Sequence, residues 1–211
     1  MLECIIFDLD GTLVKSHETI FKTTVKTLEE LNLSTNINEQ KFYNLLGHHF
    51  KDIFDECGID VPDVEHFINI YKELYFDFIG DSALYENAAL VLQELKKRKI
   101  KTGLLTTKGQ DQAEKISRHF GIETNLDSIE GRKNEIAIKP APDQFLKICK
   151  ELNVNSQNSL MVGDTELDIE CGKSAGAKTC AVSFGYRKVE ELNKLNPDFL
   201  INDLSEILSL I

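Results

Sequence analysis

Two aspartates that follow a short apolar segment are the first residues in this chain whose spacing suggests chemistry. The segment 4–7 is apolar and leads directly into Asp8, Asp10, Gly11 and Thr12. Side chains two residues apart in extended chain share a face, so the two carboxylates can converge. At about 4 Å they would repel by roughly 4 kcal/mol at an effective dielectric near 20. The pair therefore needs a cation, a shared proton or open water, and Gly11 leaves room for a ligand close to the backbone.

Other polar residues of chemical interest follow apolar segments later in the chain. They are Thr106, Thr107 and Lys108 at the end of the segment 101–106, Lys139 ahead of an expected helix, and Asp164 and Asp168 after the segment 159–162. Each one alone also fits an ordinary role, as a strand residue, a solvated cation or a capped helix start. In parallel sheets, however, ligands bind beyond the carboxyl ends of the strands. The joint occurrence of these residues at such ends favours one shared site.

The segments that would carry these residues show two alternating sequence patterns, one typical of helices and one typical of buried strands. From residue 86 onward, stretches with helical spacing alternate with short apolar runs, which predicts a parallel sheet with helices on both faces and right-handed crossovers. We therefore expect the α/β class with a Rossmann-like core. The expected strands are 4–7, 101–106, 127–129, 159–162, 178–182 and 199–201, and a helix is expected at the C-terminus.

A long helical stretch separates the first expected strand from all the others. Residues 15–81 show helical spacing without a strand signal, which predicts an inserted four-helix cap. The catalytic core would then consist of residues 1–14 and 82–211. The four expected helices are about 16–31, one capped by Asn38 and stopping at Gly47, one through Phe50 that ends at Gly58, and one from Phe67 to Phe78.

Composition and charge narrow the class of protein. The 211 residues include 42% hydrophobic and 28% charged residues, which is ordinary for a soluble globular protein. The apolar runs are too short to span a membrane, and the early strand leaves no place for a signal peptide. The five cysteines form no C-x-x-C, so we expect free thiols and a cytoplasmic location. The net charge of −11 argues against nucleic-acid binding, and the expected partner is a small molecule.

Taken in order, these motifs resemble those of the haloacid dehalogenase-like hydrolases. The resemblance rests on Asp8-Leu-Asp10-Gly-Thr12, on Thr106, on Lys139-Pro140 and on Gly163-Asp164-x-x-x-Asp168. It covers essentially the whole chain. A helical cap placed directly after the first motif is similar to the phosphoglycolate phosphatase-like branch of that family.

The resemblance implies a magnesium-dependent phosphatase that acts on a small phosphorylated metabolite. It implies that Asp8 is the nucleophile, which forms an aspartyl-phosphate, and that Asp10 is the general acid and base. Mg²⁺ would be held by the Asp8 carboxylate, the Asp10 main-chain carbonyl and Asp164. Asp168 would be a further metal ligand or would orient the others.

The same resemblance assigns residues to the substrate. Thr106 would donate a hydrogen bond to a phosphoryl oxygen, and Lys139 would neutralise Asp8 and the phosphoryl charge. Further substrate-binding candidates, next to these residues or in the cap, are Gly11, Thr107, Lys108, His48 and His49.

Departures from the family pattern leave the substrate open. Lys15 stands where the branch usually has Asp, Tyr85-Glu86-Asn87 replaces Tyr-Pro-Gly, and Thr107 replaces a common Asn. Inorganic pyrophosphate and nucleotide monophosphates are therefore alternative substrates. Asp10 disfavours dehalogenase and phosphonoacetaldehyde hydrolase activity.

Two readings outside the phosphatases also remain open. A β-phosphoglucomutase-like mutase is one, although Ile20 occupies the position of the cap histidine of those enzymes and a histidine occurs nearby at His17. The other is a catalytically silent interaction protein on the same fold.

The connections of the cap suggest how it could act. It joins the core through only two segments, near residues 14–17 and 80–85, which is typical of a lid that closes over a substrate. Gly47, His48 and His49 interrupt its helices. We expect this loop to face the active site, with an exposed interhelix turn as the alternative, and a monomer or homodimer as the assembly.

Overall fold

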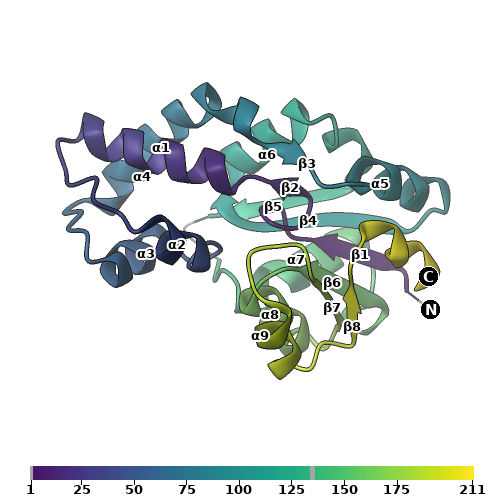
Figure 1. Ribbon diagram of the computed structural model, residues 1–211. Coiled ribbons are helices and arrows are strands. Elements are labelled where there is room, and N and C mark those ends of the chain that lie inside the picture. Colours follow the sequence, from purple (N-terminus) through teal and green to yellow (C-terminus); the bar gives the residue numbers. More distant parts are fainter. Residues whose placement is uncertain (1, 134–135) are drawn as a thin grey trace. The chain divides into compact units, whose positions relative to one another are not determined.

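A six-stranded parallel sheet is the central element of this computed structural model, which describes residues 2–133 and 136–211 (Figure 1). The strands stand in the order β5-β4-β1-β6-β7-β8, and every neighbouring pair is parallel. Their bounds are β1 Cys4–Phe7, β4 Lys101–Gly109, β5 Ser128–Arg132, β6 Ser159–Gly163, β7 Lys178–Val182 and β8 Phe199–Ile201. This sheet confirms the predicted α/β class with a Rossmann-like core.

The first strand lies in the middle of the sheet because its side chains are apolar on both faces. All four residues of β1 are fully buried, as expected for a strand covered by helices on each side. Phe7 is paired with Leu104 of β4 and with Val162 of β6. From β1 the chain fills one side of the sheet and then crosses to β6 to fill the other. The strand order therefore reverses between β1 and β6, and sheets of this kind bind ligands at the carboxyl end of the strands beside such a reversal.

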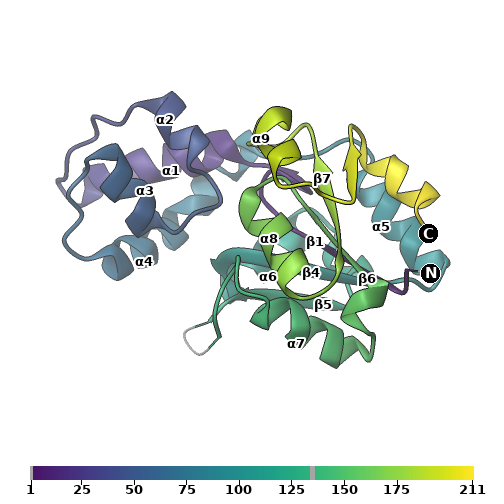
Figure 2. The same cartoon turned by 90° about the horizontal axis from the view of Figure 1, so that it is seen from below.

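Helices cover both faces of this sheet. Figures 1 and 2 show α5 and α6 on one face and α7 and α8 on the other. The helix bounds are α5 Ala88–Lys97, α6 Gln110–His119, α7 Asp143–Leu152, α8 Glu166–Ser174 and α9 Val189–Lys194. On the second face, Phe145 and Ile148 of α7 and Cys171 of α8 pack against Ile6 and Met161. Burial of these apolar side chains fixes α7 and α8 against the sheet, and the first turn of α8 carries Asp168.

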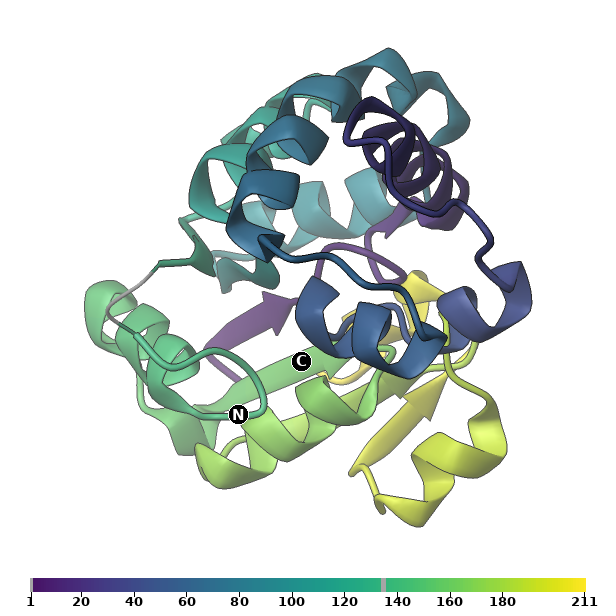
Figure 3. The same cartoon turned by 90° about the vertical axis from the view of Figure 1, so that its left-hand side faces the viewer.

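Residue contacts divide the chain into two compact units, of which the second is helical. The sheet unit consists of Met1–Val14 and Leu84–Ile211, and the helical unit of Lys15–Ala83. Figure 3 shows the helices of the second unit as purple to blue ribbons. They are α1 His17–Glu30, α2 Glu39–Asn44, α3 Phe50–Cys57 and α4 Val64–Leu74. The two chain segments that join the units, β2 Val14–Lys15 and β3 Ala83–Leu84, pair as a two-stranded sheet.

Local sequence signals explain the ends of several helices in the helical unit. The Asn38 side chain accepts a hydrogen bond from the Lys41 N–H at 2.8 Å and so caps α2. Gly58 ends α3 in the left-handed region, at φ 70°. The core of the helical unit is aromatic and includes the buried rings of Phe54 and Phe67, whose centroids lie 4.8 Å apart.

Several expected element boundaries differ from the structure, and three of these differences have a visible local cause or a change of helix type. Strand β4 continues past residue 106 to Gly109, because its pairing with β5 shifts register between Leu105 and Gly109 and then resumes. Helix α4 ends at Leu74 and is followed by a 3₁₀ turn at Tyr75–Asp77. The C-terminal helix is a 3₁₀ helix, Leu204–Ser209, since Asp203 bonds the Ser205 N–H and hydroxyl and competes with α-helical pairing.

Among the helices of residues 2–133 and 136–211, none is both long enough and apolar enough to cross a membrane.

Candidate active site

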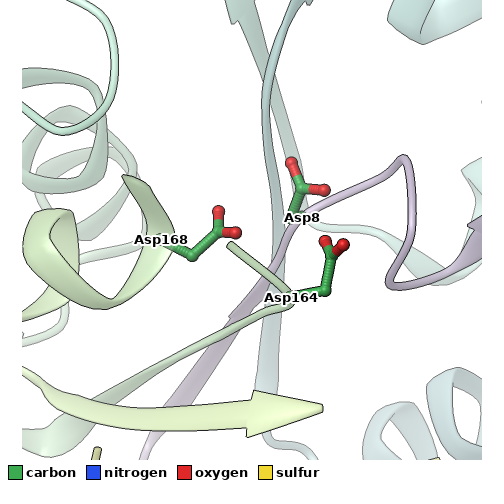
Figure 4. A group of neighbouring side chains, drawn as sticks. All are labelled: Asp8, Asp164 and Asp168. Atoms are coloured by element: carbon green, nitrogen blue, oxygen red, sulfur yellow. The ribbon is translucent and has the colours of Figure 1, made fainter. Parts of the chain in front are cut away.

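Three carboxylates meet at the carboxyl edge of the sheet, beside the reversal in strand order. Asp8 follows β1, Asp164 follows β6, and Asp168 lies in the first turn of α8. Figure 4 shows the three side chains turned toward one another. One oxygen of each lies within 4.8 Å of the others, and all three residues are buried. Such a cluster cannot remain charged in the protein interior without cations.

The ammonium group of Lys139 supplies one of those cations. Its Nζ lies 2.6 Å from Oδ1 of Asp8 and 2.6 Å from Oδ1 of Asp168, and it also donates to the Leu105 carbonyl at 3.1 Å. All three bonds are buried. With three carboxylates and one ammonium, the cluster keeps an excess of two negative charges when fully ionised.

The pKa values of these groups reflect both burial and this charge excess. Burial raises the pKa of Asp8 to about 7, with the neighbouring Asp168 and Asp10 adding to the rise and Lys139 opposing it. Burial, followed by the charges of Asp8 and Asp168, raises the pKa of Asp164 well above its usual range. Burial alone would lower the pKa of Lys139, but the adjacent carboxylates outweigh it and the pKa is raised. The site therefore strongly favours an additional positive charge.

Asp164 is held in place from two sides. The Thr12 hydroxyl donates to its Oδ1 at 3.1 Å, and the Tyr186 N–H donates to its Oδ2 at 2.7 Å. Gly11, at φ +90°, faces this carboxylate so closely that a Cβ there would lie 2.3 Å from Oδ2. Only glycine combines this backbone angle with this approach.

Asp168 is the most fully engaged of the three carboxylates. Its Oδ1 accepts from Lys139, and its Oδ2 accepts from the Thr165 N–H at 3.0 Å and the Thr165 hydroxyl at 2.7 Å. These bonds cap α8 and fix Lys139 at the same time. Because both oxygens of Asp168 already accept hydrogen bonds, this residue is better suited to orient its neighbours than to bind a metal ion with both oxygens.

A second ion pair lies beside the cluster. Nζ of Lys108 is 3.1 Å from Oδ2 of Asp10, and the two side chains are only 10% and 13% exposed. The Lys108 N–H donates to the Thr106 hydroxyl oxygen at 3.2 Å. The irregular end of β4 thus brings a hydroxyl and a cation to the edge of the sheet that carries Asp8 and Asp10.

The structure brings together part of the set of residues singled out from the sequence. Direct bonds connect Asp8, Asp168 and Lys139, with Asp164 alongside, and a separate ion pair connects Asp10 and Lys108. Thr107 follows Thr106 in β4. His48 and His49 belong to the helical unit, where Nδ1 of His49 accepts from the Lys51 N–H at 3.2 Å and caps α3.

Two contacts to Asp164 lie outside the set predicted from the sequence. Thr12 belongs to the first motif, and its hydroxyl was the available signal for a bonding role. Tyr186 contributes a backbone N–H, for which residue type carries no signal.

Comparisons with known proteins identify the class to which this chain belongs. The family model described as haloacid dehalogenase-like hydrolase matches residues 5–182. The PpaX protein of Clostridium perfringens is 34% identical, with 100% of this chain and 98% of that protein covered. The protein named pyrophosphatase PpaX from Bacillus thuringiensis (strain Al Hakam) is 30% identical, with 100% and 96% covered. A crystal structure of a predicted phosphoglycolate phosphatase from Haemophilus somnus shares the fold, with a TM-score of 0.84, 24% identity and coverage of 99% and 97%.

The parallel sheet and these matches together define the class of this protein as a hydrolase. The chain belongs to the haloacid dehalogenase-like hydrolases. Within that family it is an enzyme of the phosphatase class.

Proposed function

We propose that this phosphatase removes phosphate from a small phosphorylated compound in a Mg²⁺-dependent reaction that passes through an aspartyl-phosphate on Asp8. The observation that carries the proposal is the buried cluster of Asp8, Asp164, Asp168 and Lys139 at the reversal of strand order. The helical unit would act as the cap of this core.

The donor set fits Mg²⁺. Mg²⁺ binds oxygen ligands and commonly uses one or two carboxylates together with water and phosphate oxygens. Asp8 and Asp164 would provide carboxylates, Asp10 its main-chain carbonyl, and Asp168 would orient the others. When its three carboxylates are ionised, the cluster carries two excess negative charges, which one such ion would balance. When bound, Mg²⁺ would neutralise charge on the nucleophile and on the phosphoryl group.

The side chain of Asp8 would carry out the bond-making step. Its free oxygen attacks phosphorus and forms an aspartyl-phosphate, while the bond from phosphorus to the leaving oxygen breaks. Lys139 balances the charge on Asp8 during this step, and the Thr106 hydroxyl donates to a phosphoryl oxygen. A water molecule then attacks phosphorus, which releases phosphate and restores the Asp8 carboxylate.

Asp10 would manage the protons in both halves of the reaction. It gives its proton to the leaving oxygen in the first half and takes a proton from the attacking water in the second. Lys108, 3.1 Å from Asp10, would then lie close to the departing oxygen as well.

That cation favours inorganic pyrophosphate as a second candidate substrate. The leaving group of pyrophosphate is itself a phosphate and carries charge that an adjacent ammonium stabilises. The name pyrophosphatase, carried by a relative that matches across this whole chain, points the same way.

The substrate class is tested by following phosphate release from a panel of compounds, with Mg²⁺ and with EDTA in its place. The panel consists of pyrophosphate, phosphoglycolate, nucleotide monophosphates, sugar phosphates and p-nitrophenyl phosphate. We expect Mg²⁺-dependent release that is fastest on one small compound. Release that persists in EDTA, or is absent from every compound, would contradict the proposal.

We expect Lys108→Met to lower kcat/KM for pyrophosphate about 10²-fold, the size associated with loss of one group that stabilises developing charge. On p-nitrophenyl phosphate the loss should be only a few-fold, because that leaving group needs little help. Lys115→Met, at an exposed position of α6, makes the same charge change and is the control. Equal losses on both substrates would limit Lys108 to holding Asp10.

Discrimination between substrates is proposed to reside in the helical unit. Apart from Lys108, the edge of the sheet supplies the chemistry of the transferred phosphoryl group, so organic groups beyond the phosphate must be recognised elsewhere. We expect His48→Ala to reduce kcat/KM several-fold on the best metabolite and to leave p-nitrophenyl phosphate unchanged. His49→Ala also removes the cap of α3, so its melting temperature must be measured alongside its kinetics. If neither variant changes the ratio of the two substrates, specificity lies elsewhere in the unit.

A further inference from the structure

We propose that Arg187 and Glu166 form a positioning pair that fixes Asp164 for metal binding through the loop 183–187. This inference rests on the proposed Mg²⁺ site and adds two residues to it. Neither residue is among those that the family motifs single out.

The pair is a two-bond ion pair between separate segments of the sheet unit. Nε of Arg187 donates to Oε2 of Glu166 at 2.7 Å, and Nη2 donates to Oε1 at 3.0 Å. Arg187 is 8% exposed, and its Nη1 has no hydrogen-bond partner in the part of the chain that the structure describes. The charge of this buried guanidinium is therefore balanced mainly by Glu166, and the two parallel bonds fix its orientation.

Glu166 is close in sequence to Asp164 itself, and Arg187 is next to a residue that holds Asp164. Glu166 is two residues after Asp164 and begins α8. Tyr186, which precedes Arg187, donates its N–H to Oδ2 of Asp164 at 2.7 Å. The loop 183–187 and the segment 164–166 are therefore joined by two contacts, the Tyr186–Asp164 hydrogen bond and the Arg187–Glu166 ion pair.

Gly185 shows how tightly the loop is placed against this carboxylate. A Cβ at Gly185 would lie 2.1 Å from Cβ of Asp164, so the loop backbone touches the aspartate side chain directly. A small shift of the loop would change both this contact and the Tyr186 hydrogen bond. Within the part of the chain that the structure describes, the Asp164 carboxylate accepts one other hydrogen bond, from the Thr12 hydroxyl. Its position therefore depends strongly on the loop.

The other end of the loop is anchored independently. The Tyr85 hydroxyl donates to the Phe184 carbonyl at 3.3 Å, and the two rings lie 4.7 Å apart. The Ser183 hydroxyl is hydrogen-bonded to Asn202 at 2.7 Å. Loss of the Arg187–Glu166 pair should therefore loosen the Asp164 end of the loop without releasing the whole segment.

The test measures metal binding without substrate. Free Mn²⁺ is followed by electron paramagnetic resonance during titration of the wild type, Arg187→Met, Arg187→Lys, Glu166→Gln and the double variant Arg187→Met/Glu166→Gln. We expect the Mn²⁺ Kd to rise about tenfold in each single variant, at the lower end of the 10- to 100-fold range known for groups that orient metal ligands. The double variant should be no weaker than the worse single variant, because both changes break one interaction.

A matched control is provided by a second ion pair of the same geometry. Nε and Nη2 of Arg118 donate to the two carboxylate oxygens of Glu123 at 3.1 and 2.9 Å, but this pair is exposed. Arg118→Met should leave the Mn²⁺ Kd unchanged. Activity assays then add a second readout, in which the Mg²⁺ concentration for half-maximal rate rises in Arg187→Met while kcat at saturating Mg²⁺ is largely recovered.

The possible outcomes separate this inference from the proposed function. A wild type that binds no Mn²⁺ overturns both. A wild type that binds, with an Arg187→Met variant that is folded and binds equally well, overturns the positioning role alone. A loss confined to Glu166→Gln also overturns it, since Glu166 would then act without Arg187. If Arg187→Met does not fold, Arg187→Lys keeps the charge, removes the two-bond geometry and decides the question.

Discussion

Replacing Asp8 with asparagine should reduce phosphate release to the uncatalysed background while leaving the fold intact. The amide oxygen is a weak nucleophile and carries no charge, so the covalent route and one metal ligand are lost together. Enzymes accelerate phosphate monoester hydrolysis by up to ~10²¹-fold, so little activity remains once that route is closed. The measurement is phosphate release from the best substrate at saturating Mg²⁺, with circular dichroism to monitor folding.

The control for this variant is Asp143→Asn, which makes the same chemical change at an exposed position of α7. It should retain full activity. A folded Asp8→Asn enzyme that turns over at the wild-type rate would exclude Asp8 as the nucleophile and leave the cluster with a metal-binding role only.

Replacing Lys139 with methionine should have the second largest effect, and it should act on both stability and rate. The Lys139 side chain is 2% exposed and is bonded to two buried carboxylates. Removing one partner of a buried ion pair typically costs about 3–5 kcal/mol. For a chain of this size, each kcal/mol lowers the melting temperature by about 2–4 °C. We therefore expect a fall of roughly 10 °C and a loss of at least about 10²-fold in kcat.

Lys147→Met is the matched control for that experiment. Lys147 is also bonded to a buried carboxylate, that of Glu130 at 2.6 Å, but Glu130 keeps Lys133 as a second cation. Activity should remain, and the melting temperature should change less than in Lys139→Met. Full activity in a Lys139→Met enzyme would show that the positive charge at this position is dispensable.

The sequence is most informative about the sheet, because its periodicity follows directly from burial. A run such as Cys4–Phe7 is apolar on both faces, and this pattern, repeated between helices, predicts a parallel sheet whose class the structure confirms. The strands 178–182 and 199–201 have the expected bounds. The extension of β4 to Gly109 depends on its register with β5, which is a property of two segments and not of either one.

Within the site, residue type reveals groups that need charge and misses groups that act through the backbone. Aspartates and a lysine at strand ends are visible in the sequence because burial of such charges demands partners. The Tyr186 N–H is invisible, since nearly every residue has one. The Arg187–Glu166 pair is hidden for another reason, since its partners are brought together only by the return of the chain after β7.

Because β2 pairs with β3, the chain leaves the sheet unit and returns to it at two adjacent points, and the helical unit is the segment inserted between them. The Tyr85 N–H donates to the Leu13 carbonyl at 3.0 Å, so the two parts of the sheet unit are hydrogen-bonded to each other directly beside the insertion. Nothing in the strand order depends on the length of chain between these points. A change in the length of the inserted segment therefore need not alter the order of the strands or the edge of the sheet that carries Asp8 and Asp164.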